Sequence, residues 1–374
     1  MTNASDAMNG FKKIITRDQF EWLFPVLPIQ LDSYIRLAYK GGFVYLKPDH
    51  ANRRGLKGKQ YDVNSLYPWV MYECLLPYGY PMYFEGEPVD DPKYPLYIVR
   101  MRCAFRVKPG HIPTIQLKNN YSFIPTEYLE STWNEKKQLY EIVDLTLTNV
   151  DLKLFKEHYE ILNDEYECGW KFKANRGMFK EYIDYWMHIK ETTTGALRQL
   201  AKLMLNSLYG KFATNPKGKK KIPYLDDEGV VKYKTQDDDD RDPVYTAMGA
   251  FITAYAREKT IRSAQANFDR FIYADTDSLK LIGYEEPEGL DVHPTRLGAW
   301  KDEGDFSDSL WIRPKTYALT VNGDLKVTCA GMPDNVKQLV TYDNFKPGSS
   351  FEGKLMPRRH KGGIVLEETT FTIK

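Results

Sequence analysis

The chain has 374 residues, of which 42% are hydrophobic and 28% charged, and its formal net charge is +1. This composition excludes a disordered protein, and the balanced charge excludes a global basic field as the basis for nucleic-acid binding. The length suits two or three domains, or one large divided domain.

Cysteine usage and the N-terminus bear on the compartment. The four cysteines, Cys74, Cys103, Cys168 and Cys329, show no CxxC spacing, which predicts a reducing environment without a zinc site or a disulfide framework. We see no apolar core of a signal peptide and no apolar run long enough to span a bilayer. We therefore expect a cytoplasmic protein with no membrane partner.

The first half of the chain predicts strands and one capped helix. Residues 97–108 alternate between apolar and mostly basic side chains, as in a half-buried strand with a basic outer face. Asp151 is a candidate N-cap for a helix whose apolar positions run from Leu154 to Leu162.

The second half predicts a helical hairpin and two strand pairs. Apolar spacing from Met178 predicts one helix, and a second one ends at Gly210 as its C′ residue. Residues 222–234 predict a protruding β-hairpin, and 244–268 a long helix. Residues 271–283 read as strand, turn and strand. Because strands and helices do not alternate regularly, we predict the α+β class.

The turn within 271–283 carries two carboxylates, Asp275 and Asp277. On extended backbone, residues two apart project to one side, where their charges repel unless a cation lies between them. Hard oxygen ligands suit Mg²⁺ or Mn²⁺. A solvated acidic turn is the alternative, and the apolar flanking strands weaken it. Asp62, in the stretch DVNSLYP, also ends a predicted strand and offers a further carboxylate to the same ions.

One face of the second predicted helix is unsuited to a protein core. Arg198, Lys202, Asn206 and Tyr209 are spaced by four, four and three residues and therefore share this face. Two cations, an amide and an aromatic ring suit a nucleoside triphosphate. An amphipathic helix that turns its polar side to water is the alternative.

Five motifs in order resemble those of the family B DNA polymerases. DVNSLYP, KLMLNSLYG and YADTDS are similar to motifs A, B and C, RPKTY to the downstream KxY element, and AYKGG to the upstream YxGG element. The resemblance extends over nearly the whole chain and is strongest to the protein-primed, phi29-type branch.

The resemblance implies a right-hand polymerase fold with two insertions. The expected parts are the palm in two pieces, the first insertion with its template and terminal-protein region, the fingers, the second insertion that encircles DNA, and the thumb. The expected ranges are 1–73 and 244–328 for the palm, 74–177 for the first insertion and 178–213 for the fingers. The second insertion is expected at 214–243 and the thumb at 329–374.

The resemblance also implies residue roles. Asp62, Asp275 and Asp277 would be catalytic, and two Mg²⁺ ions, with Mn²⁺ as a substitute, would be held by Asp62, Val63 and Asp277. The residues that would bind the incoming nucleotide are Leu66, Tyr67, Lys190, Arg198, Lys202, Asn206 and Tyr209. The residues that would bind DNA are Tyr39, Gly41, Gly42, Lys315 and Tyr317.

The implied activity is template-directed addition of dNTPs to a 3′-hydroxyl, by a monomer acting on primer–template DNA with a terminal protein as a further primer. Only 37 residues precede AYKGG, so we expect no 3′–5′ proofreading domain in this sequence. Two alternatives stay open: a palm polymerase that uses ribonucleotides, which Tyr67 argues against, and a non-catalytic DNA-binding remnant.

Overall fold

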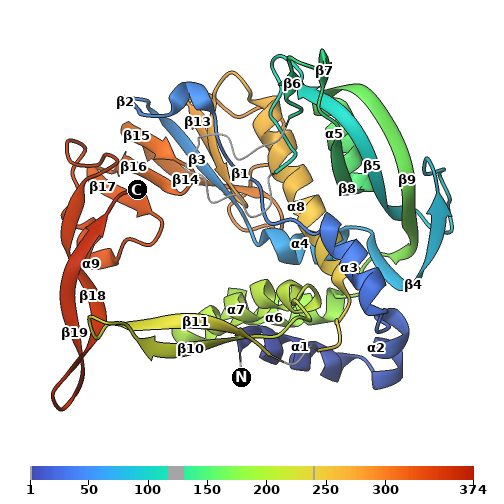
Figure 1. The fold of residues 1–374 in the computed structure, drawn as a ribbon, viewed down its shortest axis with the longest axis horizontal. Coiled ribbons are helices and arrows are strands. Elements are labelled where there is room, and N and C mark those ends of the chain that lie inside the picture. Colours follow the sequence, from blue (N-terminus) through green and yellow to red (C-terminus); the bar gives the residue numbers. More distant parts are fainter. Residues whose placement is uncertain (1, 117–129, 239–240) are drawn as a thin grey trace.

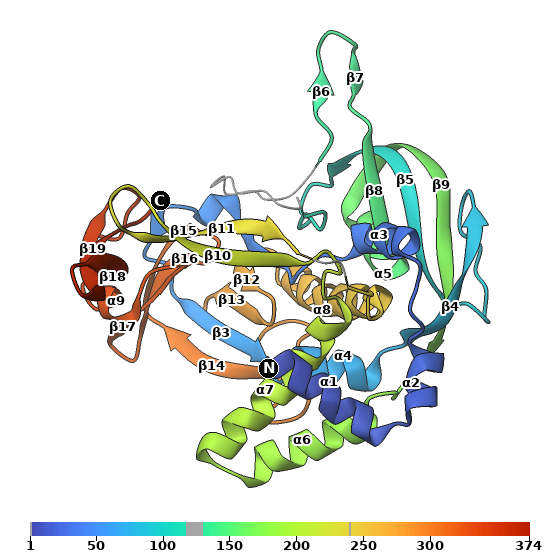
Figure 2. The same ribbon diagram turned by 60° about the horizontal axis from the view of Figure 1, so that its bottom comes forward.

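The computed structural model describes residues 2–116, 130–238 and 241–374 (Figures 1 and 2). Its central antiparallel sheet has the strand order β1-β12-β13-β3-β14. The strands are β1 (Val44–Leu46), β3 (Gly58–Val63), β12 (Phe271–Asp275), β13 (Ser278–Ile282) and β14 (Trp300–Phe306). The predicted strand–turn–strand at 271–283 is thereby confirmed.

One face of the central sheet is covered by the long helix α8 (Thr246–Ala266), which confirms the helix predicted at 244–268. Tyr61, Leu279 and Leu281 belong to the same buried cluster as the apolar side chains of α8. Because side chains alternate along a strand, the opposite face carries Asp62 and Lys280. The short helix α4 (Leu66–Glu73) follows β3 directly and packs against α8.

A second sheet, with the order β17-β16-β15-β2, lies beside the central one. Its strands are β2 (Arg53–Arg54), β15 (Asp308–Arg313), β16 (Thr316–Val321) and β17 (Asp324–Cys329). The 3₁₀ turn η1 (Pro48–His50) precedes β2, and α9 (Asp334–Lys337) follows β17. The chain ends in the hairpin of β18 (Ser350–His360) and β19 (Gly363–Thr372).

A third sheet, with the order β4-β9-β5-β8, has its own buried cluster. Its strands are β4 (Leu76–Glu85), β5 (Leu96–Val107), β8 (Val143–Thr148) and β9 (Tyr159–Asn175). β5 confirms the strand predicted at 97–108. A small hairpin of β6 (Trp133–Asn134) and β7 (Leu139–Tyr140) projects from this part of the molecule in Figure 2.

The helix on the third sheet, α5 (Asn149–His158), differs from its prediction. Its N-cap is Thr148, whose hydroxyl accepts a hydrogen bond from the Asp151 amide, so the prediction of Asp151 as the cap was wrong. The helix also ends before Tyr159, which begins β9. The Asp151 carboxylate is turned instead toward a buried arginine on α8.

Five helices form a separate layer below the sheets in Figure 1 or connect it to them. They are α1 (Asn3–Ile14), α2 (Arg17–Leu23), α3 (Ile29–Ala38), α6 (Lys180–Thr192) and α7 (Gly195–Phe212). α6 and α7 confirm the predicted helical hairpin. The C′ prediction for Gly210 was wrong, because α7 continues to Phe212, whose fully buried ring joins the core. No helix in the described ranges is long and apolar enough to cross a bilayer.

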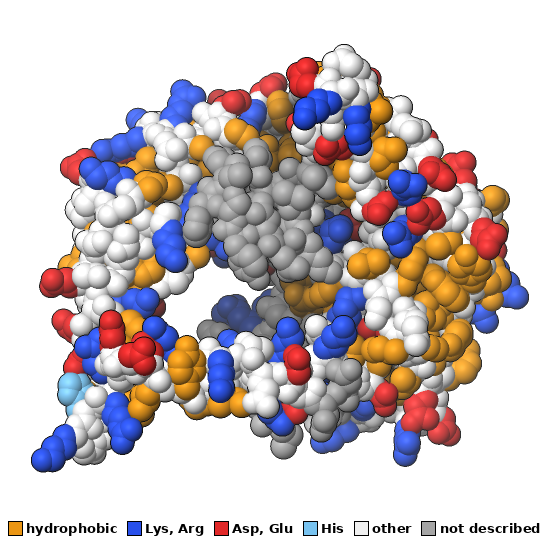
Figure 3. All heavy atoms as spheres, in the orientation of Figure 1, with side chains coloured by type: hydrophobic (Ala, Val, Ile, Leu, Met, Phe, Trp, Pro, Cys, Tyr) orange, Lys and Arg blue, Asp and Glu red, His pale blue; other side chains and the backbone are white. Residues whose placement is uncertain are grey.

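Two hairpins meet at the lower left border of an opening in the space-filling view (Figure 3). The predicted protruding hairpin is β10 (Lys219–Leu225) and β11 (Val231–Asp237), with its turn at Gly229. The Arg359 amide on β18 donates to the Gly229 carbonyl at 2.8 Å, and Val230 forms a bridge with Arg358. These contacts place Arg358 and Arg359 at the tip of the β10–β11 hairpin.

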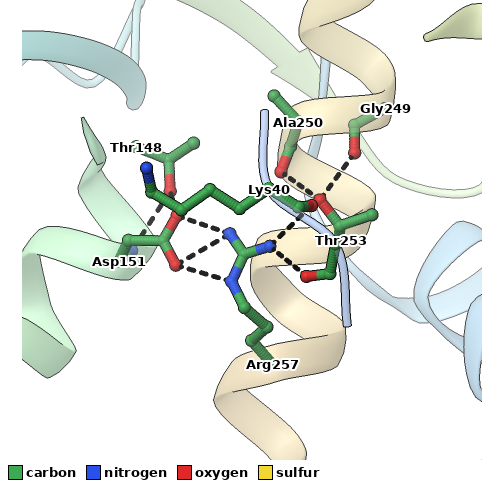
Figure 4. Close-up of polar contacts among 8 residues, drawn as sticks. Lys40, Thr148, Asp151, Gly249, Ala250, Thr253 and Arg257 are labelled. Atoms are coloured by element: carbon green, nitrogen blue, oxygen red, sulfur yellow. Dashed lines mark hydrogen bonds and ion pairs between the residues drawn. The ribbon is translucent and has the colours of Figure 1, made fainter. Parts of the chain in front are cut away.

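A buried ion pair joins α8, α5 and the loop before β1 (Figure 4). Nη2 of Arg257, a residue 2% exposed, lies 2.7 and 2.9 Å from the two Asp151 carboxylate oxygens, and Nε lies 3.1 Å from one of them. Nη1 donates to the carbonyl oxygens of Lys40 and Gly41, at 2.9 and 2.8 Å. The guanidinium therefore fixes backbone of the predicted YxGG element.

Replacement of Asp151 by alanine leaves the Arg257 charge buried without a partner. We expect the free energy of unfolding to fall by about 3–5 kcal/mol, measured by denaturant unfolding. Glu160→Ala is the matched control, because the Arg106–Glu160 pair on the third sheet is about half exposed. That control should cost under about 1 kcal/mol, and equal losses in both variants would contradict the prediction.

Candidate active site

Two of the three predicted carboxylates are brought together by strand register. Asp62 on β3 lies directly opposite Ser278 on β13, so it is adjacent to the turn that carries Asp277. The Val63 amide donates to the Asp277 carbonyl at 2.7 Å, which ties β3 to this turn.

The turn differs from the predicted extended geometry. Thr276 has a φ of +58°, and the Asp277 amide donates to the Asp275 carbonyl at 2.7 Å. The assumption that Asp275 and Asp277 project to one side of extended backbone was therefore wrong. The Thr276 amide also donates to the Phe43 carbonyl at 2.6 Å, and a Cβ added to Gly42 would lie 2.4 Å from the Thr276 hydroxyl oxygen. A glycine is required there for this close approach.

The Asp275 carboxylate is already paired. Lys315 Nζ lies 2.8 and 2.7 Å from its two oxygens, and the Tyr273 hydroxyl donates to it at 3.2 Å. The Tyr273 hydroxyl oxygen also accepts the Lys315 amide, at 3.0 Å. Tyr317, two residues on, stacks on Trp311 with ring centroids 4.8 Å apart. The predicted KxY element thus contacts one carboxylate of the predicted motif C directly.

Asp62 and Asp277 are in a different electrostatic state. Burial, and then repulsion by Asp277, raises the pKa of Asp62 to about 7. Burial is also the main cause that raises the pKa of Asp277, and repulsion by Asp275 adds to it. Glu303 on β14, which the sequence analysis missed, further raises the pKa of Asp62. Two half-buried carboxylates with little positive charge beside them form a site that fits a divalent cation.

The described residues supply only part of such a site. No group of three or more His, Cys, Asp or Glu side chains in the described ranges is arranged to hold an ion. The two carboxylates would need further oxygen ligands, which the Val63 carbonyl, water or the phosphates of a substrate can provide.

Positive charge gathers next to the carboxylates, at the start of α4. Lys190 Nζ lies 2.7 Å from the Ser65 hydroxyl oxygen. Burial, then the neighbouring charges of Lys202 and Arg198, lower the pKa of Lys190. Arg198 Nε also donates to the Lys190 carbonyl at 3.3 Å, which places the arginine over the end of α6.

The N-terminus of α4 adds backbone donors to this positive charge. Ser65, with a φ of +56°, is the N-cap, and its side chain does not cap the helix. The amides of Leu66 and Tyr67 lie in the first turn, where α-helical amides have no partner within the helix. This arrangement suits an anion such as a phosphate.

Aromatic rings complete the site. The rings of Tyr67 and Tyr209 stack with centroids 4.0 Å apart and an interplanar angle of 22°. Tyr39 is close enough for the Tyr209 oxygen to raise the pKa of its hydroxyl, although burial is the larger cause. Asn206 lies on the exposed side of α7, one turn from Tyr209.

Sequence reasoning missed several residues that position the site. Ser65 and Tyr273 lie inside two of the motifs that it recognised, and their contacts arise only from the turn geometry. Arg257 and Lys280 resemble ordinary polar positions of a helix and a strand in the sequence. Glu303 lies in the polar stretch between Trp300 and Phe306 of one strand, and this pattern gives no sign of a functional site.

Comparison with known proteins agrees with this geometry. Residues 1–293 match the family described as DNA polymerase type B, organellar and viral. The DNA polymerases of the Bacillus phages PZA and phi29 are each 48% identical to the chain over its whole length, which spans 68% of theirs. The DNA polymerase of Streptococcus phage Cp-1 is 35% identical over 100% of the chain and 67% of its own length.

Solved structures show the same fold. The phi29 DNA polymerase complexed with primer–template DNA and incoming nucleotides superimposes with a TM-score of 0.91 and 47% identity, over 100% of this chain and 68% of that one. Its complex with single-stranded DNA gives a TM-score of 0.89.

The chain belongs to the organellar and viral type B DNA polymerases. Within that family it is of the phi29 type, with the α+β fold predicted from the sequence, and its activity is template-directed DNA synthesis. DNA polymerases in general use divalent metal ions.

The raised pKa of Asp62 predicts a pH dependence of stability in metal-free protein. The folded state holds this proton up to about pH 7, whereas the unfolded state releases it near 3.8. The free energy of unfolding should therefore fall as the pH rises through this window. In EDTA, the melting temperature of the wild type should fall more between about pH 5 and pH 8 than that of Asp62→Asn. Parallel curves for the two proteins would contradict the assignment.

Proposed function

We propose that Asp62 and Asp277 hold two divalent ions, Mg²⁺ with Mn²⁺ as a substitute, together with the Val63 carbonyl. Such ions, when bound, stabilise the attacking and leaving oxygens of an in-line phosphoryl displacement. The observation that carries this proposal is the partial burial of the two carboxylates beside each other without a compensating salt bridge among the described residues. Asp275 acts through its pairing with Lys315, which orients the turn and the KxY element.

The incoming dNTP binds between α4 and α7. Lys190, Lys202 and Arg198 supply charge for the triphosphate, and the amides of Leu66 and Tyr67 supply hydrogen-bond donors. Tyr67 lies beneath the sugar and excludes a 2′-hydroxyl, while Asn206 and Tyr209 line the nascent base pair. The stacked pair of tyrosine rings supports this assignment, because it gives a flat apolar wall beside the cations.

Primer–template DNA runs along the remaining site residues. Tyr39, Gly41 and Gly42 contact the template, and Lys315 and Tyr317 contact the 3′ end of the primer. The paired hairpins of β10–β11 and β18–β19 border the opening at its lower left in Figure 3 and help to encircle duplex. The phi29 polymerase complex with primer–template DNA supports this path by its similarity to the chain.

We assign the parts of the hand by the ranges that the resemblance implies. The central sheet with α8 is the palm (1–73 and 244–328), α6 and α7 are the fingers (178–213), and the segment 329–374 is the thumb. The insertions are 74–177, which faces the template and a terminal protein, and 214–243. The monomeric state, and priming by a terminal protein, rest on the resemblance to the protein-primed branch.

Asp277→Asn tests the central proposal. It should lower Mg²⁺-dependent primer extension by about 1,000-fold or more, because the substitution removes one of two metal-holding charges. Affinity for primer–template DNA, measured by fluorescence anisotropy, should change by no more than about twofold, since phosphate contacts dominate it.

The matched control for this test is Asp302→Asn, an exposed carboxylate on β14 that pairs with Lys59. It should extend primers normally. If the wild type itself adds no nucleotide to a primer, the alternative of a non-catalytic DNA-binding remnant replaces the proposal. Sequence alone predicts that these 374 residues do no 3′–5′ proofreading. This stays a prediction, and release of a labelled mismatched primer end tests it.

Tyr67→Val removes the ring proposed to lie beneath the sugar. The ratio of kcat/KM for dNTPs to that for rNTPs should fall by about 10–100-fold, because a clash with the 2′-hydroxyl is relieved. Tyr72→Val, on the same helix but beside Lys180, should leave this ratio unchanged. Equal use of both nucleotides by the wild type would favour the ribonucleotide alternative.

A further inference from the structure

A lysine is buried on the same face of the central sheet as the carboxylates. Lys280 lies in the middle of β13, opposite Tyr273 on β12 and Gln60 on β3, and it is 6% exposed. Its neighbours Leu279 and Leu281 point toward α8, so its side chain points toward the face that carries Asp62.

The surroundings of this ammonium are unusual for a buried charge. Within the described ranges, Lys280 Nζ makes no hydrogen bond and no salt bridge. Burial lowers its pKa, while Asp62, Asp275, Asp277 and Glu303, in that order, all act against this and favour the charged form. A charge on a buried lysine side chain is costly, and the surrounding carboxylates offset part of that cost.

The charges of the site explain why a cation belongs there. Asp275 is paired with Lys315, whereas Asp62 and Asp277 have no salt bridge among the described residues. A positive charge behind them reduces their mutual repulsion when no ion is bound. The same charge repels an entering divalent ion, so it also reduces metal affinity.

We propose that Lys280 is a positioning residue that places a positive charge behind Asp62 and Asp277, holding them together before divalent ions bind and weakening the binding of those ions. This inference rests on the proposed function, because it needs Asp62 and Asp277 to be the metal-holding pair. Lys280 thereby sets the ion concentration at which the polymerase becomes active. A lysine present only for its apolar stem would leave metal affinity unchanged when replaced by an apolar residue of similar length.

Direct Mn²⁺ binding to the DNA-free protein tests the proposal, by electron paramagnetic resonance and by the rise in melting temperature that Mn²⁺ produces. Lys280→Met and Lys280→Gln should each bind Mn²⁺ about tenfold more tightly than the wild type, because one repelling charge is lost. Both variants should also show a larger rise in melting temperature on adding Mn²⁺. Lys280→Arg, which keeps the charge, should stay within about threefold of the wild type.

Lys301→Met is the matched control. Lys301 lies opposite Asp62 on β14 and lowers the pKa of that carboxyl, but its side chain is 43% exposed and pairs with Glu303. Solvent screens an exposed charge, so Mn²⁺ affinity should change by less than about twofold. Two replacements of different shape at Lys280, checked by circular dichroism, separate a charge effect from a folding defect.

Failure of this inference can be told apart from failure of the proposed metal site. If Asp277→Asn loses tight Mn²⁺ binding while both neutral variants of Lys280 bind as the wild type does or more weakly, only the role of Lys280 is overturned. If the wild type and Asp277→Asn bind Mn²⁺ equally, the metal site itself is overturned, and the role of Lys280 with it.

Discussion

The ion pair between Arg257 and Asp151 is the interaction on which the arrangement of the site depends. Each arm of the guanidinium serves a different part of the molecule: Nε and Nη2 hold the helix on the third sheet, and Nη1 holds the loop before β1. Thr260, one turn along α8, donates to the Thr276 carbonyl at 2.6 Å. One helix therefore fixes both the proposed template loop and the carboxylate-bearing turn.

The site itself is a set of charges that the protein does not balance. Asp275 is paired with Lys315. Strand register places Asp62 beside the turn that carries Asp277, and burial together with repulsion by Asp277 raises the pKa of Asp62. On the other side, three cations converge around Lys190, where burial also disfavours charge. The carboxylates favour cationic ligands, and the cations around Lys190 favour anionic ligands. A triphosphate with divalent ions would bring both kinds of charge at once, which explains why folding can tolerate the imbalance.

The ring around the opening is built on a different principle. Its two hairpins meet through backbone contacts at Gly229 and Arg359, and their exposed faces carry lysines and arginines. Exposed lysines and arginines attract phosphates and require no particular base. They suit a role in retaining duplex of any sequence, since phosphates present the same charge at every step.

Sequence by itself determined many of the elements and indicated the family. Apolar periodicity predicted the strand at 97–108, the paired helices, the hairpin at 222–234 and the acidic strand–turn–strand, because these patterns arise from local burial. Ordered motifs then indicated the family, and they predict that Asp62, Lys202 and Tyr209 share one site although long stretches of chain separate them.

Tertiary structure decided which charges meet. Asp151 looks like a helix cap in sequence, yet Thr148 caps the helix and the carboxylate pairs with Arg257, 106 residues away. Gly210 looks like a helix end, yet burial of Phe212 extends α7 past it. Lys280 looks like an alternating strand residue, and only the folded sheet shows that it lies behind the carboxylates. These outcomes could not be predicted from local sequence, because electrostatic partners and core contacts are set by segments distant in the chain.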